Sequence, residues 1–285
     1  MTSAFITRRA TPDERVALDK LAAKCLDAHG GLPQLLDPDF AAALFPDDAL
    51  ILCRDATQQL VAALALTHES DDSAFFSLLI LPTVTGDIAT EIFAAAETLS
   101  TRRVQIFRCE SVNPRTTDAF SPAGEQFFSE YVMSRPTHGM VPVDFSNPTH
   151  PWTDDNAPLF FAAYQGSFRE RPGFPDPSQE EWIADQVESE EFHREWSRVA
   201  LDESGTPLGF VLVDDDQIWQ MGVIPAARRQ GVGRQLLTHA VHALGALGKP
   251  DAWLNVNLNN PAAIALYESV GFEVVGQRSR FRREI

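Results

Sequence analysis

The sequence has few cysteines and few positive charges. It contains 3 Cys, and its 23 Lys and Arg stand against 40 Asp and Glu, which gives a formal net charge of -17. Because the acidity is spread over both halves of the chain, no basic face is available for a phosphate backbone, and nucleic acid is excluded as a partner. The cysteines form no CxxC pair and are odd in number, so neither a disulfide framework nor a metal site is predicted.

Long apolar runs are also missing. The N-terminal stretch has no apolar core of the signal-peptide type, and no run approaches the length that spans a bilayer. We therefore expect a cytoplasmic protein with no membrane partner. At 285 residues and 44% hydrophobic content, the chain is long enough for two domains with cores of their own. Its acidity either favours a cationic substrate such as an amine or serves solubility alone.

The two halves of the sequence follow the same outline. Each reads as helical pattern, then two strands around a polar turn, a further strand that ends at a proline (Pro82 or Pro225), a helix, and another strand. Ser178 and Glu181 form a capping box in the second half. This repeat suggests a duplication and a mixed α/β fold. With the Pro-rich stretch Asp144–Asp155 as the connection, we expect a first domain at 1–145, a linker at 146–153 and a second domain at 154–285.

A basic, glycine-containing stretch, AARRQGVGRQLL, follows the second of these prolines. A helix that begins at the glycine pair leaves several backbone N–H groups unpaired and pointing in one direction. Gly231 and Gly233 carry no side chain that would keep a pyrophosphate away, and three arginines add positive charge: Arg228, Arg229 and Arg234. The stretch alone is equally typical of an ordinary helix start with solvated arginines. Its spacing excludes a Rossmann glycine motif and a P-loop.

The spacing of Arg228, Gly231 and Gly233 resembles the Q/R-x-x-G-x-G/A signature of the GNAT superfamily of acyl-CoA N-acyltransferases. A second block, Leu254–Phe272 with its Asn, Leu-Tyr-Glu and Gly-Phe, resembles the next block of the same family. The resemblance covers about residues 154–285. It implies acetyl-CoA as co-substrate, no metal, and direct transfer of the acetyl group to a primary amine in a ternary complex.

The resemblance also implies roles for individual residues. Main-chain N–H groups would bind the pyrophosphate of coenzyme A at Gln230, Gly231, Val232, Gly233 and Arg234, with Arg228 and Arg229 lining the same loop. Main-chain groups of Met221 and Val223 would bind the acetyl carbonyl and the pantetheine arm, in a slot between two diverging strands. Asn260 would touch the pantetheine side of that slot.

For proton transfer, the resemblance implies a general acid and leaves the general base open. Tyr267 resembles the family's general acid, although an aromatic core residue is the alternative. Many relatives carry a glutamate on the strand before the loop, where this chain has Gln217, which cannot act as a base. Period-two alternation places five residues on the same face of this strand: Asp215, Gln217, Trp219, Met221 and Val223. Asp215 is then either a base or part of a solvated turn, and Trp219 either a pocket wall or a core residue.

The first half repeats the order of helices and strands of the second half but lacks the residues expected to bind an anion. Its segment after the first proline, TVTGDIATEI, has one glycine, no arginine, and Asp87 at the helix start, where a carboxylate occupies the place of a phosphate. A degenerate domain before a complete one resembles tandem members of the superfamily, such as mycothiol synthase, in layout. In that layout the loop Phe168–Pro177 would cover the amine, with Phe174 among the substrate-binding residues.

The sequence thus predicts an acetyl-CoA-dependent N-acetyltransferase that acts on a small-molecule amine. A protein or peptide acetyltransferase is the alternative within the class, and a non-catalytic acyl-CoA sensor is the alternative outside it. Both a monomer and a homodimer are compatible with the sequence.

Overall fold

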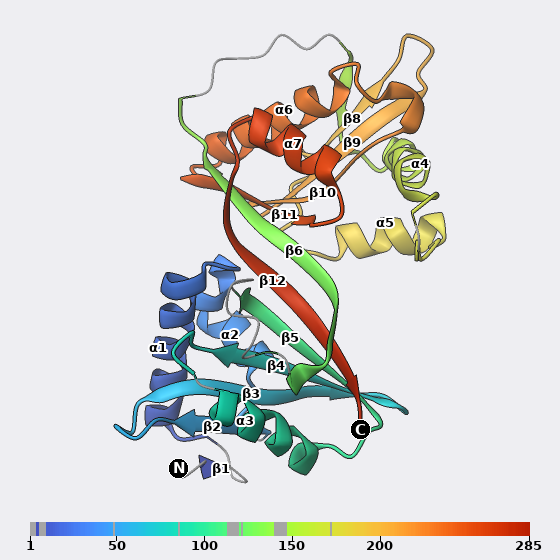
Figure 1. Ribbon diagram of the computed structural model, residues 1–285. Helices are drawn as coiled ribbons and strands as arrows, with labels where there is room; N and C mark the ends of the chain where they lie inside the picture. Colours follow the sequence, from blue (N-terminus) through green and yellow to red (C-terminus); the bar gives the residue numbers. More distant parts are fainter. Residues whose placement is uncertain are drawn as a thin grey trace. The chain divides into compact units, whose positions relative to one another are not determined.

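The computed structural model describes residues 4–5, 10–47, 49–84, 86–112, 120, 122–139, 147–171 and 173–285 (Figure 1). The chain forms two compact units. Unit 1 comprises Met1–Val132, Asn257–Asn259 and Val274–Ile285, and unit 2 comprises Met133–Val256 and Asn260–Glu273. Within the described ranges, no helix combines the length and the apolar character needed to cross a bilayer.

Unit 1 is a mixed sheet covered on both faces by helices. Its helices are α1 (Pro12–His29), α2 (Pro38–Leu44) and α3 (Gly86–Leu99). Its strands are β1 (Ala4–Phe5), β2 (Leu50–Arg54), β3 (Leu60–Glu69), β4 (Ser73–Ile80), β5 (Val104–Val112), β12 (Glu273–Glu284) and most of β6 (Glu125–Pro136), in the order β1-β2-β3-β4-β5-β12-β6. β4 and β5 run parallel.

The two faces of this sheet have separate cores. Leu50 and Leu52 of β2 pack in a cluster with Leu21 of α1, whereas Ile51 lies in a second cluster with Phe93 of α3. Since successive side chains of a strand point to opposite faces, α1 and α3 cover opposite sides of the sheet. This is the arrangement visible in the lower part of Figure 1.

Unit 2 repeats this plan. Its helices are α4 (Ala157–Phe168), α5 (Gln179–Val187), α6 (Val232–Ala246) and α7 (Pro261–Ser269). Its strands β7 (Thr149–Pro151), β8 (Arg198–Leu201), β9 (Pro207–Asp214), β10 (Gln217–Val223) and β11 (Asp251–Asn257) lie in the order β11-β10-β9-β8-β7. β10 and β11 run parallel, and the predicted capping box is present at the start of α5.

An aromatic cluster fills the face of unit 2 under α4 and α5. Its largest members are Trp152, Phe160, Phe161, Tyr164, Trp182 and Phe210. The Tyr164 ring stacks on Trp182 with 5.0 Å between centroids. Such ring pairs add specific geometry to apolar burial, so they fix α4 against α5 and β9.

The unit boundaries differ from the predicted domains at 1–145 and 154–285. β12 pairs with β5 from Gln277↔Val112 to Glu284↔Val104, so the end of the chain completes unit 1. Inside the predicted linker 146–153, β7 pairs with β8 and Trp152 is 3% exposed, which a linker residue would not be. The choice of a strand's partner depends on distant residues, and the local hydrophobic pattern carries no information on it.

Candidate functional site

The start of α6 presents unpaired backbone donors. Gly231 is the residue before the helix, with φ of 88°, and it supplies no side-chain cap. The N–H of Gln235 donates to the Gly231 carbonyl (3.0 Å), so the N–H groups of residues 232–234 have no acceptor within the helix. A Cβ atom at Gly231 would meet nothing within 4 Å. An open surface with positive backbone polarity therefore lies over the helix start.

The edge of β10 beside this helix is open. The N–H of Ile224 donates to β9 (3.0 Å), and because residues of an antiparallel pair alternate in direction, the main-chain groups of Met221 and Val223 point to the other side. On that side lies β11, which pairs with β10 only at Gln217↔Trp253. The two parallel strands then diverge, as the sequence predicted, and β11 does not pair with the main-chain N–H and C=O of Met221 or with the N–H of Val223 along the gap.

Gly233 brings the helix and the strand together. A Cβ atom at this position would lie 3.1 Å from Leu266 Cδ2 and 3.5 Å from both Met221 Cε and Val223 Cγ2. An alanine here would require the end of Leu266 to shift by a few tenths of an ångström, and a larger side chain would push α6 away from β10 and α7. The glycine therefore lets the unpaired N–H groups of α6 approach the open edge of β10.

Two of the three arginines are held in place by carbonyl groups. Arg228 donates from Nε to the Val223 carbonyl (3.1 Å) and from Nη2 to the Ser167 carbonyl (3.3 Å). Arg234 donates from Nη2 to the carbonyl of Ser269, at the end of α7 (3.2 Å). Both side chains remain exposed, so their charges stay available to an anion at the helix start.

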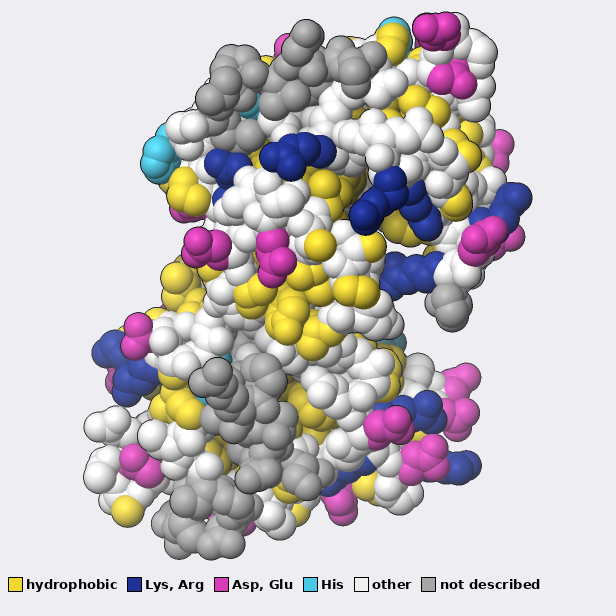
Figure 2. All heavy atoms as spheres, turned by 45° about the horizontal axis from the view of Figure 1, so that its top comes forward, with side chains coloured by type: hydrophobic (Ala, Val, Ile, Leu, Met, Phe, Trp, Pro, Cys, Tyr) yellow, Lys and Arg dark blue, Asp and Glu magenta, His cyan; other side chains and the backbone are white. Residues whose placement is uncertain are grey.

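The loop before α6 is exposed as well. Arg229 adopts φ of 64°, and the side-chain amide of Gln230 donates back to the Ala226 carbonyl (2.7 Å). Figure 2 shows a group of dark blue Lys and Arg side chains on the surface of unit 2, in a protein whose total charge is -17. Arg228 and Arg229 in the loop before α6 and Arg234 in the first turn of the helix are all exposed.

Tyr267 and Asn260 both belong to α7. The Tyr267 ring is half-buried, 6.2 Å from the Phe272 ring, and among the described residues its hydroxyl has no hydrogen-bond partner. Burial raises the pKa of Tyr267 to about 12, so the side chain stays protonated at neutral pH. Asn260 caps α7, because its Oδ1 accepts from the N–H of Ala263 (3.2 Å).

The predicted face from Asp215 to Val223 is not regular, and that prediction is wrong. Asp215 lies in the hairpin turn with φ of 40° and forms an ion pair with Lys249. Gln217 is the first residue of β10, at the end of the strand away from α6. The register with β9 shifts at Trp219, which is a bulged residue with 57% of its surface exposed, and not a core residue.

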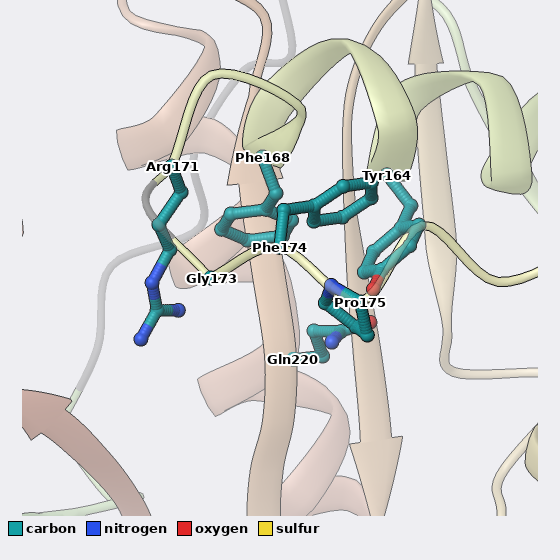
Figure 3. A pocket seen from close by; sticks show the side chains of 7 residues that line it. All are labelled: Tyr164, Phe168, Arg171, Gly173, Phe174, Pro175 and Gln220. Carbon is teal, nitrogen blue, oxygen red and sulfur yellow. The ribbon is translucent and has the colours of Figure 1, made fainter.

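A cavity of about 230 Å³ lies between the end of α4, the following loop and β10 (Figure 3). Phe174, predicted to bind substrate, lines it, 5.4 Å from the Tyr164 ring. The other lining residues are Tyr164, Phe168, Arg171, Gly173, Pro175 and Gln220. Gln220 was missed because uniform alternation assigns it to the opposite face. Only the bulge at Trp219 turns it into this cavity, and a bulge leaves no clear mark in the sequence.

Comparison with known proteins agrees with this geometry. Residues 149–272 match the Acetyltransferase (GNAT) family. This part of the chain belongs to the GNAT family. The match spans the diverging strands, the start of α6 and the whole of α7, which are the elements that carry the site.

Two similar curated proteins act on amines of polypeptides. One is [Ribosomal protein bS18]-alanine N-acetyltransferase of Escherichia coli (strain K12), 45% identical over 62 residues, which are 22% of this chain and 42% of that protein. The other is Peptidyl-lysine N-acetyltransferase YjaB of the same strain, 35% identical over 79 residues, or 28% of this chain and 50% of that protein. The chain therefore spans half or less of the length of each relative.

Solved structures match both units. A GCN5-related N-acetyltransferase from Sphaerobacter thermophilus has a TM-score of 0.72 at 17% identity and covers 98% of this chain and 95% of its own. A tandem GNAT protein from the clavulanic acid biosynthesis pathway has a TM-score of 0.58 at 14% identity, covering 99% and 98%. The predicted fold, two GNAT-like domains of mixed α/β type, is thereby confirmed.

Proposed function

We propose that this protein transfers the acetyl group of acetyl-CoA to a primary amine of a peptide or protein. The observation that carries the proposal is the junction of β10 and α6. The main-chain N–H and C=O of Met221 and the N–H of Val223 lie unpaired beside the N–H groups at the helix start, with a glycine at the closest approach. Such a junction binds a chain-like ligand that ends in a phosphate group.

The residues present fit coenzyme A. Pyrophosphate would be bound by main-chain N–H groups at Gln230, Gly231, Val232, Gly233 and Arg234, with charge from Arg228 and Arg229 nearby. The edge of β10 at Met221 and Val223 would bind the pantetheine arm and donate to the acetyl carbonyl oxygen from a fixed N–H. Asn260 would border the arm at the start of α7. When bound, acetyl-CoA supplies an activated acetyl thioester.

Tyr267 is proposed as the proton donor. Its raised pKa of about 12 keeps the proton on Oη, so it acts as an acid toward the departing sulfur and not as a base toward the amine. No carboxylate stands among the residues that line the Phe174 cavity. The amine therefore enters in its neutral form, and kcat/KM should rise with pH until the pKa of the acceptor amine is passed.

The comparisons favour a polypeptide acceptor over the small-molecule amine expected from the sequence. Both curated relatives named above act on polypeptide amines, one on an alanine and one on lysine residues. The peptide acetyltransferase, first held as the alternative, is therefore the function proposed here.

Thiol release from acetyl-CoA tests the proposal. The purified full chain is incubated with a peptide that has a free α-amine, a peptide whose only amine is a lysine side chain, spermidine, and glucosamine. We expect thiol release with a peptide and a product heavier by one acetyl group in mass spectrometry. Binding of acetyl-CoA without thiol release on any amine would support the sensor instead, and faster turnover of spermidine or glucosamine would restore the small-molecule alternative.

A further inference from the structure

The Phe174 cavity has a composition of its own. Its walls are the rings of Tyr164, Phe168 and Phe174, and Figure 3 shows these rings gathered above the carboxamide of Gln220. The guanidinium of Arg171 lies apart from the rings, at the rim. The lining therefore combines apolar surface with one positive charge, in contrast to the acidic chain as a whole.

The volume of the cavity limits what it can hold. Pockets for complete small ligands generally measure roughly 300–1,000 Å³. At about 230 Å³ this cavity is smaller than that range, and it is large enough for one apolar amino-acid side chain such as that of Leu or Phe. Aromatic walls without a carboxylate also offer a buried ammonium group cation–π attraction but no ion pair.

One polar atom in the cavity is unsatisfied. The Oε1 atom of Gln220 is buried and has no hydrogen-bond partner. A buried acceptor without a donor is unfavourable, and a rotation of the Gln220 side chain that turned this oxygen toward a ligand N–H in the cavity would relieve the penalty. Gln220 also precedes Met221, whose main chain faces the gap between β10 and β11. The unsatisfied oxygen thus lies one residue away from the strand edge proposed for the acetyl group.

We propose that this cavity receives the first side chain of the acceptor peptide, that this side chain is aromatic or branched aliphatic, and that Gln220 Oε1 accepts a hydrogen bond from a main-chain N–H of the same peptide. The inference rests on the proposed acetyl transfer and specifies its acceptor: an α-amine at the end of a chain that begins with an apolar residue. Lysine side chains and polyamines are poorer acceptors in this arrangement, because a charged end in the cavity would find no carboxylate among its described lining residues.

The test uses tripeptide amides of the form X-Gly-Gly, in which X is Phe, Leu, Ala, Gly or Lys, with the full chain and saturating acetyl-CoA. We expect kcat/KM for Phe and Leu to exceed that for Gly on the order of tenfold or more, since burial of an apolar side chain discriminates at this level. Equal values for all five, or a preference for Lys, would overturn the inference while leaving acetyl transfer intact. No thiol release with any peptide would refute acetyl transfer to a peptide amine.

Two variants locate the effect. Phe174→Ala should remove most of the advantage of the Phe peptide over the Gly peptide. Phe192→Ala is the matched control, because Phe192 packs against the same aromatic cluster without lining the cavity, so its Phe-to-Gly ratio should equal that of the unaltered protein. If both variants lower the ratio alike, the cavity is not the side-chain site.

Gln220→Met examines the hydrogen bond. The methionine has a similar volume but no oxygen acceptor, so KM should rise severalfold for all five peptides, while the affinity for acetyl-CoA stays constant. An unchanged KM would remove Gln220 from the acceptor site. A parallel loss of acetyl-CoA affinity would show that the substitution disturbs β10, and the role of Gln220 would then be rejected.

Discussion

The two units differ most at one corresponding strand. When Pro82 is taken to correspond to Pro225, Leu78 of β4 corresponds to Met221 of β10, and Ile80 corresponds to Val223. Leu78 and Ile80 are each 1% exposed within the core of unit 1, whereas Met221 and Val223 are partly accessible. A strand that is closed in unit 1 is open in unit 2.

The parallel neighbours of these strands behave differently too. β4 and β5 pair from Ser73↔Val104 to Ser77↔Arg108, while β10 and β11 pair only at Gln217↔Trp253. The pairs of β4 with β5 end at Ser77, before Leu78 and Ile80, so at these two positions the units differ in the burial of the strand. The prediction that the Asp87 carboxylate takes the place of a phosphate at the start of α3 concerns a side chain that lies outside the described residues. The comparison of β4 with β10 indicates that unit 1 repeats the fold of unit 2 but not its ligand-binding edge.

The largest effect is expected when β12, the strand that completes unit 1, is displaced. A Cβ atom at Gly276 of β12 would lie 1.9 Å from the backbone N of Gly31, so Gly276→Ala forces the strand away from the C-terminal end of α1. We expect a loss of more than about 4 kcal/mol in the free energy of unfolding, measured by urea denaturation.

Gly245→Ala serves as its control, because a Cβ atom there would come no closer than 3.3 Å, to Thr137 Cβ. This variant should stay within about 1 kcal/mol of the parent. If Gly276→Ala has the parent's unfolding midpoint, β12 does not hold unit 1 together in the way described.

The next largest effect concerns the proton donor. Tyr267→Phe removes the only hydrogen that the ring can donate, and kcat should fall about 100-fold with the Kd of acetyl-CoA unchanged. Tyr131→Phe makes the same chemical change in unit 1 and should leave kcat at the parent value. Equal rates for Tyr267→Phe and the parent would assign the proton donor elsewhere.

The smallest expected effect is on acid stability. Burial lowers the pKa of His239 in α6 to about 4, so the folded protein disfavours the protonated form. Its stabilising contribution is complete above the unfolded pKa of about 6.5 and is lost as pH falls toward 4. Between pH 7 and pH 5 we expect a loss on the order of 1–2 kcal/mol from this side chain.

His239→Gln checks this assignment, because the glutamine keeps a hydrogen-bond donor and does not titrate. The variant should show a smaller difference in unfolding free energy between pH 7 and pH 5 than the parent. The same slope in both proteins would assign the acid sensitivity to other groups, among them His29 of unit 1, whose pKa burial also lowers.

Local features of this fold were predictable, and non-local ones were not. The capping box of Ser178 and Glu181 and the glycine pair at the start of α6 depend on residues a few positions apart, and both lie where the sequence placed them. The pairing of β12 with β5 joins residues far apart in the sequence. No period in either strand specifies it.

The candidate site also has one part that the sequence predicts and one part that it does not. The edge of β10 at Met221 and Val223 follows from the order of strand, loop and helix. Gln220 depends on a single extra residue at Trp219, which reverses the direction of every side chain after it. Sequence reasoning therefore indicates the co-substrate side of the site, while the acceptor side requires the structure.

Isothermal titration calorimetry of the full chain tests whether unit 2 alone binds acetyl-CoA. Gly231 and Gly248 have nearly the same backbone conformation, with φ of 88° and 81°, and a Cβ atom at either would meet nothing within 4 Å. Both alanine variants therefore carry the same backbone strain, and only Gly231→Ala places a methyl group at the start of α6. We predict one bound acetyl-CoA per chain in the parent and in Gly248→Ala, and no measurable binding in Gly231→Ala. Two molecules bound per chain, or binding that survives in Gly231→Ala, would contradict the account.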